Sequence, residues 1–316
     1  MAGMRENFMA KVQKVDKIWL DGKMIPWDQA NVHILTHTLH YGLGVFEGIR
    51  CYECADGRSA IFRLKDHIDR LYDSGHILLM DVPFPKDEIL KACKDVFTIN
   101  KLKAGYLRPL AFIGDGEMGL YATSNPIRVA IIAWPWGTYL GEEGVKNGIR
   151  TKVSSFVRHH VNAMMGKSKT VGNYVNSILA KREAMLAGYE ETIMLDPQGY
   201  VAEASGENLF VVRNGIVKTP PLTNVLEGIT RDTVIALLAD ENIKVQEALI
   251  TRDELYIADE IFMTGTAAEV TPVRELDHRT IGTGKPGPIT QKVQALYFDL
   301  VKGKNKKHTE WLDYVD

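Results

Sequence analysis

Residues 166–182 read GKSKTVGNYVNSILAKR, a polar segment that leads into an apolar helical run. The run predicts a helix from about Asn173 to Leu186. Lys169 stands just before it among small and polar residues, so its amine could reach a cleft at the start of the helix. Lys167 is placed almost as well, and most lysines are solvated surface charges. The segment therefore offers two candidate lysines, with an ordinary surface role as the alternative for each.

Apolar patterning predicts helices and strands on both sides of this segment. The expected helices cover residues 64–77, 89–97, 173–186 and 230–238, the last with Thr230 as N-cap, and a final helix follows Pro288. The expected strands cover several short stretches in 17–52, then 106–112, 127–133, 151–157, hairpins in 192–217, and 261–263. Because these elements mix without strict βαβ alternation, the sequence predicts an α+β fold in two domains.

The segment WPWGTYLGEEG at residues 134–144 is rich in Gly, Pro and aromatic residues and is the expected connection between the domains. We expect a smaller N-terminal domain at 1–135, a linker loop at 136–144 and a larger C-terminal domain at 145–316.

The composition favours a soluble globular protein that acts on a small metabolite. Hydrophobic residues make up 45% and charged residues 25%, and the net charge is -2 without a basic stripe, which disfavours nucleic acid as a partner. The N-terminus lacks the pattern of a signal peptide, and the longest apolar stretch, 129–136, is too short to cross a membrane. Three cysteines are too few for a disulfide framework. The expected location is the cytoplasm.

Glu203 and Glu207 lie in YVAEASGENLFVV, where the flanking pattern is that of buried strands. Burial of a bare carboxylate is costly, so each acid would need a partner, and one of them could pair with an internal cation such as a protonated ring nitrogen. The alternative is a surface hairpin on which both carboxylates are harmless.

Two turns have the features of an anion site. Gly228-Ile229-Thr230 opens a predicted helix, and Gly265-Thr266-Ala267 follows a predicted strand. Free N–H groups at a helix start attract anions, and Arg63 could add a charge-assisted fork. Threonines at helix starts are more often simple caps.

His33, His37 and His40 are spaced as metal ligands on one helix face would be. Their surroundings contain β-branched residues and glycines but no neighbouring acid, which favours structural roles. We therefore expect no metal site.

Two further patterns do not indicate a functional site. Cys51 and Cys54 have the spacing of a redox pair but stand at the end of a predicted strand, which favours coincidence. The loop at 282–285 resembles a phosphate loop, but Arg279 and Pro286 replace the required glycine and hydroxyl residue.

Six segments in order resemble the branched-chain aminotransferases, members of the class IV, fold type IV family of pyridoxal-phosphate enzymes. They are HYGLGVFEGIR (40–50), YLRPL (106–110), KTVGNY (169–174), EASGENLF (203–210), EGITR (227–231) and GTAAEVTPV (265–273). The resemblance covers nearly the whole chain. It implies a fold like that of D-amino-acid aminotransferase, with a small N-terminal α/β domain, a larger domain with a β-barrel-like core and the cofactor at the domain interface.

The resemblance also implies a role for each matched residue. Lys169 forms the Schiff base with pyridoxal 5'-phosphate and shuttles the proton, with Lys167 as a mere neighbour. Glu203 binds the pyridine nitrogen, which keeps the ring an electron sink, and Tyr174 binds the phenolic oxygen. The phosphate is held by Arg63, Ile229, Thr230 and Thr266.

The implied substrate pocket consists of Tyr41, Phe46, Tyr106, Trp136, Tyr139 and Ala268. Thr266, Ala267 and Tyr106 would bind the α-carboxylate, and Arg108 the distal carboxylate of glutamate. In the family one or two pocket residues come from a second subunit, which implies a homodimer or an assembly of dimers.

The expected reaction transfers the amino group of L-leucine, L-isoleucine or L-valine to 2-oxoglutarate by a ping-pong mechanism. An aminodeoxychorismate-type lyase, a D-amino-acid aminotransferase and a binding protein without catalysis are the alternatives. Arg108 and the GTAAEV turn favour the branched-chain enzymes over the first two, and retention of Lys169, Glu203 and Arg63 argues against the third. The preference among the three amino acids and the choice between biosynthesis and degradation stay open.

Overall fold

The structure is a computed structural model that describes residues 12–137 and 139–315. The expectation that no signal peptide begins the chain concerns residues 1–11, which lie outside the described part, as does residue 138 of the predicted linker. Contacts between Cα atoms divide the chain into two units. One, called the lysine unit here, contains residues 12–137, 168–173 and 300–315. The other, called the glutamate unit, contains residues 139–167 and 174–299.

The lysine unit is built on an eight-stranded sheet with the order β17-β5-β4-β6-β7-β1-β2, in which β3 also pairs with β6. Its strands are β1 Lys17–Leu20, β2 Lys23–Pro26, β3 Gly44–Phe46, β4 Ile49–Glu53, β5 Ser59–Phe62, β6 Gly105–Ile113, β7 Ile127–Trp134 and β17 Leu312–Tyr314. Its helices are α1 His37–Tyr41, α2 Leu64–Ile77 and α3 Lys86–Ile99. The predicted helices and the long strands at 106–112 and 127–133 are confirmed.

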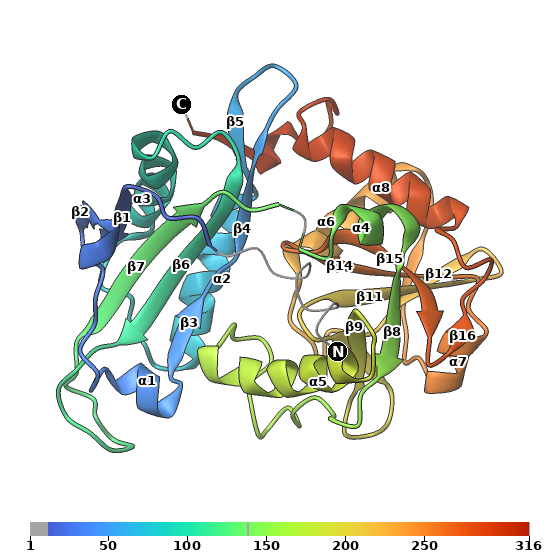
Figure 1. Cartoon of the computed structure of the whole chain (residues 1–316), viewed down its shortest axis with the longest axis horizontal. Helices are drawn as coiled ribbons and strands as arrows, with labels where there is room; N and C mark the ends of the chain where they lie inside the picture. The colour runs from blue at the N-terminus through green and yellow to red at the C-terminus, as the bar shows by residue number, and fades with distance from the viewer. Residues whose placement is uncertain (1–11, 138, 316) are drawn as a thin grey trace. The chain divides into compact units, whose positions relative to one another are not determined.

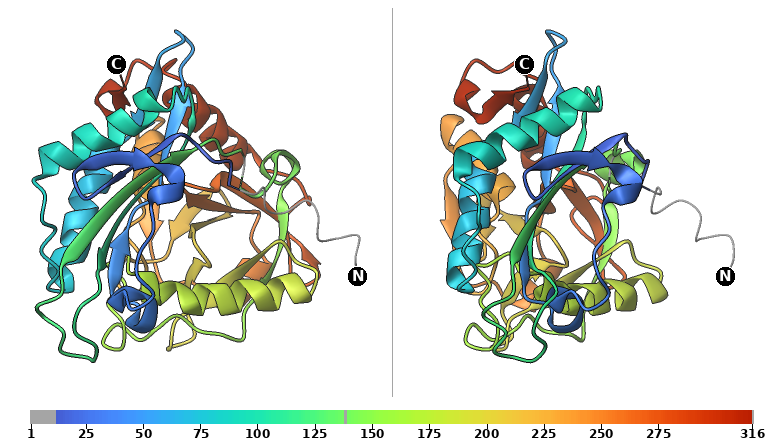
Figure 2. Two further views of the ribbon diagram at one scale, coloured as in Figure 1. Left: turned by 60° about the vertical axis from the view of Figure 1, so that its left-hand side comes forward. Right: turned by 90° about the vertical axis from the view of Figure 1, so that its left-hand side faces the viewer.

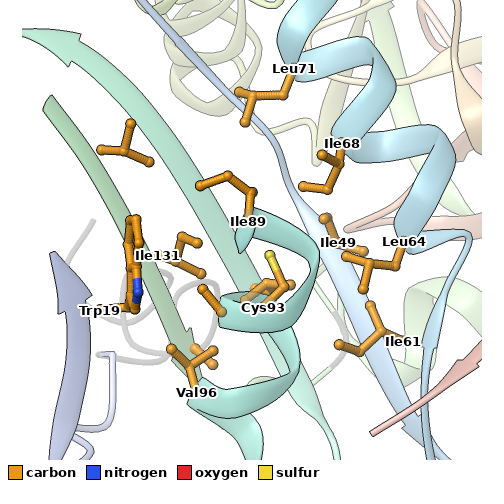
Figure 3. Close-up of a cluster of buried hydrophobic side chains, with 14 of the residues drawn as sticks. Trp19, Ile49, Ile61, Leu64, Ile68, Leu71, Ile89, Cys93, Val96 and Ile131 are labelled. Carbon is orange, nitrogen blue, oxygen red and sulfur yellow. The ribbon is translucent and has the colours of Figure 1, made fainter. Parts of the chain in front are cut away.

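Helices α2 and α3 cover one face of this sheet (Figures 1 and 2). Leu64, Ile68 and Leu71 recur at helical spacing along α2 and are fully buried. They pack with residues of α3 and of the central strands into one hydrophobic cluster, shown in Figure 3. Because successive strand residues face opposite sides, the other face of β6 and β7 carries a different set of side chains.

The glutamate unit is built on a nine-stranded sheet with the order β10-β9-β8-β15-β14-β11-β12-β13, in which β16 pairs with β15. Its strands are β8 Ile149–Val153, β9 Glu191–Leu195, β10 Val201–Ala204, β11 Asn208–Arg213, β12 Ile216–Thr219, β13 Val245–Glu247, β14 Glu260–Gly265, β15 Glu269–Leu276 and β16 Arg279–Thr280. Its helices are α4 Glu142–Asn147, α5 Tyr174–Leu186, α6 Ile229–Asp240, α7 Arg252–Tyr256 and α8 Pro288–Val301, whose last two residues count with the lysine unit.

The nine-stranded sheet is curled. β10 ends the strand order, yet its Ala204 N–H donates to the main-chain oxygen of Glu207, just before β11 in the middle of the order, at 2.8 Å. This curl agrees with the barrel-like core that the resemblance implies. The core is closely packed around it, with Phe210 and Phe262 stacked at 4.9 Å between ring centroids.

Two predictions for this unit need correction. The N-cap of α6 is Gly228, not Thr230, because the helix already begins at Ile229. The strand predicted at 151–157 is β8, which ends at Val153; Ser155 N–H instead donates to the Glu183 carboxylate. The longest helices of the described chain have 14 residues, and none has the length and hydropathy needed to cross a bilayer.

Candidate functional site

The main chain around Lys169 is fixed in the lysine unit from two sides. Ser74, on α2, accepts the Lys169 N–H at 3.0 Å, and its main-chain oxygen accepts the Ser168 hydroxyl at 3.1 Å. Phe46, at the end of β3, donates its N–H to the Lys169 oxygen at 3.1 Å. The Lys169 ammonium lies 5.1 Å from the centroid of the Phe46 ring. The segment thus presents a half-buried lysine over an aromatic ring.

Lys167 has different surroundings. Its ammonium donates to the Leu222 carbonyl and forms an ion pair with Glu227 at 2.7 Å, where both side chains are substantially exposed. These partners give Lys167 the role of a surface ion pair in the glutamate unit.

The face of β6 and β7 opposite the hydrophobic core carries aromatic and basic side chains. Tyr106 is the register partner of Trp134, and Arg108 that of Ile132, so these side chains share one face. The alternate residue Leu107 points into the core cluster. Trp136, just beyond β7, meets the Tyr106 ring edge-on at 4.5 Å. An aromatic wall therefore lines this face.

Arg108 is the cation of that wall. Its guanidinium carbon lies 4.6 Å from the centroid of Phe46 and 5.5 Å from that of Tyr106. Its buried Nε has no hydrogen-bond partner, and no carboxylate in the described part of the chain pairs with it. A half-buried cation that lacks a counter-ion is costly unless an anion arrives, so Arg108 has the surroundings of an anion-binding residue.

Glu203, on β10 of the glutamate unit, is buried, and donors of that unit surround its carboxylate. Arg158 approaches its carboxylate at 3.0 Å, the Leu226 N–H at 3.2 Å and the Asn208 amide at 3.4 Å. Such a set of donors favours a charged carboxylate. Glu207 is also buried, at 4% exposure, so the surface-hairpin alternative for these two acids is wrong.

Asn208 connects Glu203 to the start of α6. Its amide also donates to the Leu226 carbonyl at 3.0 Å, and a Cβ on Gly228 would lie 1.9 Å from its Oδ1. Gly228 caps α6 without a side-chain hydrogen bond, and Thr230 is buried in the first turn. Because the first N–H groups of a helix lack partners within it, this end of α6 is suited to an anion.

The Gly265-Thr266-Ala267 turn joins β14 to β15 in the same unit. Ala268 is fully buried after it, and its oxygen accepts the Thr271 hydroxyl at 2.7 Å. Glu269 follows at a φ of 56°, a left-handed conformation that is uncommon for a residue with a side chain. The turn is therefore held in a tight, specific shape.

The remaining predicted site residues have these positions. Arg63 caps α2, pairs with Asp66 at 2.6 Å and lies 4.6 Å from the Trp311 ring. Tyr174 begins α5, and Tyr139 lies 5.5 Å from the Lys181 ammonium. Tyr41 ends α1 and is exposed.

The three histidines are held by the main chain. His37 and His40 bond through Nε2 to the carbonyls of Gly119 and Ile34, each at 2.8 Å, and the Nδ1 of His33 accepts the Leu35 N–H at 3.1 Å. Cys51 is buried within β4, and burial raises the pKa of its thiol to about 12.

A family profile described as amino-transferase class IV matches residues 44–276. The chain belongs to the class IV aminotransferases. The branched-chain-amino-acid aminotransferases of Pseudomonas aeruginosa and Escherichia coli K12 are 52% and 45% identical to it. These alignments cover 97% and 96% of this chain and 100% and 99% of the relatives.

Solved structures of branched-chain aminotransferases have the same fold as this chain. The crystal structure of the Escherichia coli branched-chain enzyme has a TM-score of 0.94 and 44% identity, covering 96% of this chain and all of that one. The branched-chain enzyme of Thermobaculum terrenum in its PLP form, the holo form, has a TM-score of 0.89 and 36% identity, covering 96% and 99%. The fold is thus that of the family that the six sequence segments resemble.

Two residues that this class IV aminotransferase places beside the predicted ones were missed. Arg158 pairs with Glu203 across 45 positions of sequence, and Ser74 anchors Lys169 from 95 positions away. Neither lies in a recognisable motif, since each is brought into place only by the fold.

Proposed function

We propose that this chain transfers the amino group of L-leucine, L-isoleucine or L-valine to 2-oxoglutarate, forming branched-chain 2-oxo acids and L-glutamate. The observation that carries the proposal is Arg108, a cation without a carboxylate partner among aromatic rings. The rings suit a branched aliphatic side chain, since each buried methylene contributes about 0.8 kcal/mol. The cation suits the distal carboxylate of glutamate.

Pyridoxal 5'-phosphate is the cofactor of this enzyme class, and the residues present fit it. The donors around Glu203 favour a charged buried carboxylate, which is the partner that a protonated ring nitrogen requires. The start of α6, where Gly228 caps the helix without a side-chain hydrogen bond, suits a phosphate group. When bound, the cofactor supplies an electron sink for charge that develops at the substrate Cα.

The chain's own residues then have distinct duties. Lys169 holds the cofactor, takes the Cα proton at Nζ and returns a proton to complete each half-reaction. Glu203 faces the ring nitrogen, and Tyr174 binds the phenolic oxygen. Arg63, Ile229, Thr230 and Thr266 hold the phosphate.

Two kinds of contact orient the substrate. Thr266, the Ala267 main chain and Tyr106 bind the α-carboxylate in this proposal, and Arg108 binds the distal one. Contact with the side chain comes from Tyr41, Phe46, Tyr106, Trp136, Tyr139 and Ala268. Because the same pocket serves both half-reactions, the amino acid leaves as its 2-oxo acid before 2-oxoglutarate enters.

The domain division at 136–144 and the cofactor at the domain interface remain predictions. The proposed residues are divided between the two units: Lys169, Arg63 and Arg108 belong to the lysine unit, and Glu203 and Thr230 to the glutamate unit. The cytoplasmic location remains a prediction as well.

A homodimer is part of the proposal. The segment 32–35, α1 and the loop after β6 carry exposed apolar side chains, called the α1 patch here. His37 of α1 bonds to Gly119 of that loop. The patch comprises Val32, Ile34, Leu35, Leu39, Tyr41, Met118, Leu120 and Tyr121. An apolar surface of this kind favours association, and a second copy would cover it at Tyr41, beside the proposed pocket.

A side-by-side assay of amino donors tests the reaction. L-Leu, L-Ile, L-Val, D-Ala and aminodeoxychorismate are each supplied to the holoenzyme, the first four with 2-oxoglutarate. We expect glutamate formation from the three branched-chain donors. Turnover of D-Ala alone, or product formation from aminodeoxychorismate alone, would replace the proposal by one of the two rival reactions.

A further inference from the structure

Glu207, the second acid of the EASGENLF segment, has no duty in the reaction proposed above. Its side chain is buried, and its carboxyl accepts one hydrogen bond, from the Gly206 N–H at 3.1 Å. No cation in the described part of the chain forms an ion pair with it. Glu203, four residues earlier, has Arg158.

Lys181, the cation whose charge lowers the pKa of Glu207, already pairs with another acid. Lys181, on α5, pairs with Glu191, on β9, and donates to the Glu190 carbonyl at 2.7 Å. Glu191 is fully buried and also accepts the Thr192 N–H at 2.9 Å. The Lys181 ammonium is therefore oriented toward β9.

These acids and their cations form a buried group, which we call the β9–β11 acid cluster. It comprises Glu191, Glu203, Glu207, Lys181 and Arg158. Glu203 and Glu191 each have a cation at ion-pair distance, whereas no cation of the described residues pairs with Glu207, so its ionisation would leave an uncompensated negative charge inside the unit. Burial of such a charge is costly, and the least compensated acid retains its proton.

The least compensated acid is Glu207. Burial and the neighbouring Glu191 carboxylate raise its pKa to about 8, with a smaller push from Glu203. Lys181 and the Gly206 N–H oppose the rise without cancelling it.

Glu207 also lies against the turn that holds the substrate α-carboxylate in the proposed function. Asn208 is the register partner of Thr264, so Glu207 and Gly265 follow at the end of the same ladder. A Cβ on Gly265 would lie 3.2 Å from the Glu207 Cγ. A charge on Glu207 would therefore repel a carboxylate at Gly265-Thr266-Ala267.

We propose that Glu207 is a positioning residue that carries a proton at neutral pH, and that its uncharged carboxyl lets the adjacent turn accept a substrate carboxylate. Ionisation of Glu207 weakens carboxylate binding. The identity of the ligand rests on the proposed function, but the protonation of Glu207 does not.

Binding of 4-methylvaleric acid to the holoenzyme, followed by calorimetry from pH 6 to 9, tests the effect on the ligand. We expect the dissociation constant of the unaltered protein to rise above about pH 8, toward about tenfold per pH unit. Glu207→Gln, which mimics the neutral acid, removes this rise, whereas Glu143→Gln on exposed α4 keeps it. Identical pH profiles for Glu207→Gln and the unaltered protein would overturn the effect on binding.

Unfolding of the same proteins by urea tests protonation without any ligand. A carboxyl whose pKa is higher in the folded than in the unfolded state destabilises the fold as pH rises between the two values. We expect the unaltered protein to lose stability between pH 5 and 8 relative to Glu207→Gln, and Glu143→Gln to follow the unaltered protein. If the free energy of unfolding changed with pH in the same way in all three proteins, the protonation of Glu207 would be overturned. Failure of 4-methylvaleric acid to bind at any pH would instead count against the proposed function.

Discussion

In the proposed function, Arg108 serves two substrates of opposite polarity. Its guanidinium stacks on the rings of Phe46 and Tyr106, so it forms part of the apolar wall when leucine is present. With glutamate, the same guanidinium has a carboxylate to bind. The aromatic partners therefore reduce the cost of a cation in an apolar pocket.

Arg108→Ala should harm glutamate far more than leucine. Loss of a charge-assisted hydrogen bond removes about 2–3 kcal/mol from the glutamate transition state, or about 30–150-fold in kcat/KM. Steady-state kinetics with each donor measures the difference. Arg128→Ala is the matched control, because Arg128 stacks on Phe112 but already pairs with Asp21 at 2.7 Å. Equal losses for both donors would contradict the dual role.

Glu47 fixes the turn between β3 and β4 onto α2. It is fully buried, accepts from Arg70 at 2.7 Å and binds His67 at 2.7 Å. Burial opposes its ionisation, but Arg70 and His67 outweigh this and hold the pKa of Glu47 well below its usual range. Because Phe46 is its neighbour, the network also supports the main chain that binds Lys169.

Glu47→Gln should lower the free energy of unfolding by about 3–5 kcal/mol at pH 7, because it leaves the Arg70 guanidinium without its buried carboxylate partner. The folded-state pKa of Glu47 is lowered, so its stabilisation is present above the unfolded pKa of about 4.5 and is lost as pH falls below it. Urea unfolding at pH 7 and pH 4 measures both effects. Glu53→Gln, at an exposed end of β4, should change little at either pH. The difference in free energy of unfolding between Glu47→Gln and the unaltered protein should be smaller at pH 4 than at pH 7. A larger difference at pH 4 would contradict this role of Glu47.

At the scale of elements, the start of α6 depends on the absence of a side chain at Gly228. Gly228→Ala would place a Cβ 1.9 Å from the Asn208 Oδ1, so Asn208 and the α6 terminus must move apart. We expect about tenfold weaker binding of pyridoxal phosphate to the apoprotein, measured by fluorescence titration. Gly166→Ala is the control, since its Cβ would meet nothing nearer than 4.0 Å. Unchanged affinity in Gly228→Ala would show that α6 does not hold the phosphate.

Long elements with a clear period could be predicted, and short ones could not. The stripe of Leu64, Ile68 and Leu71 predicts α2 because one face of a helix must be buried. α1 has only five residues, too few to establish a period, and was expected as strand and turn. β17 pairs with β5 through Leu312 and Phe62, a contact that no local pattern reveals.

The site could be predicted only in part, because the contacts that distinguish its residues are made by the fold. Lys169 and Lys167 are nearly equivalent in sequence, and only the fold gives one an anchored main chain and the other a surface ion pair. Burial of Glu207 likewise depends on strands that are far apart in sequence. Composition and motifs could therefore indicate the chemistry but not the partners of each group.

At the scale of the whole molecule, the chain passes between its two units several times. Residues 168–173 belong to the lysine unit, while α5, which follows directly, belongs to the glutamate unit. Residues 300–315 also return to the lysine unit, where β17 completes one edge of the sheet. Each unit is therefore assembled from segments that are separated in the sequence.

The α1 patch should hold two copies together. Leu39→Asp combined with Leu120→Asp places charges in an apolar interface, so sedimentation velocity should show a shift from dimer to monomer. Leu79→Asp, an exposed site outside the patch, is the control and should remain dimeric. A dimer that persists in the double variant would assign the interface to another surface.

Borohydride reduction of the holoenzyme, followed by peptide mapping, tests most directly whether Lys169 holds the cofactor. Reduction should fix the cofactor on the peptide that contains Lys169, specifically at that residue. Lys167→Ala should retain the adduct and most of the turnover, whereas Lys169→Ala should lose both. An adduct at Lys167, or an unmodified Lys169 in the reduced holoenzyme, would contradict the account.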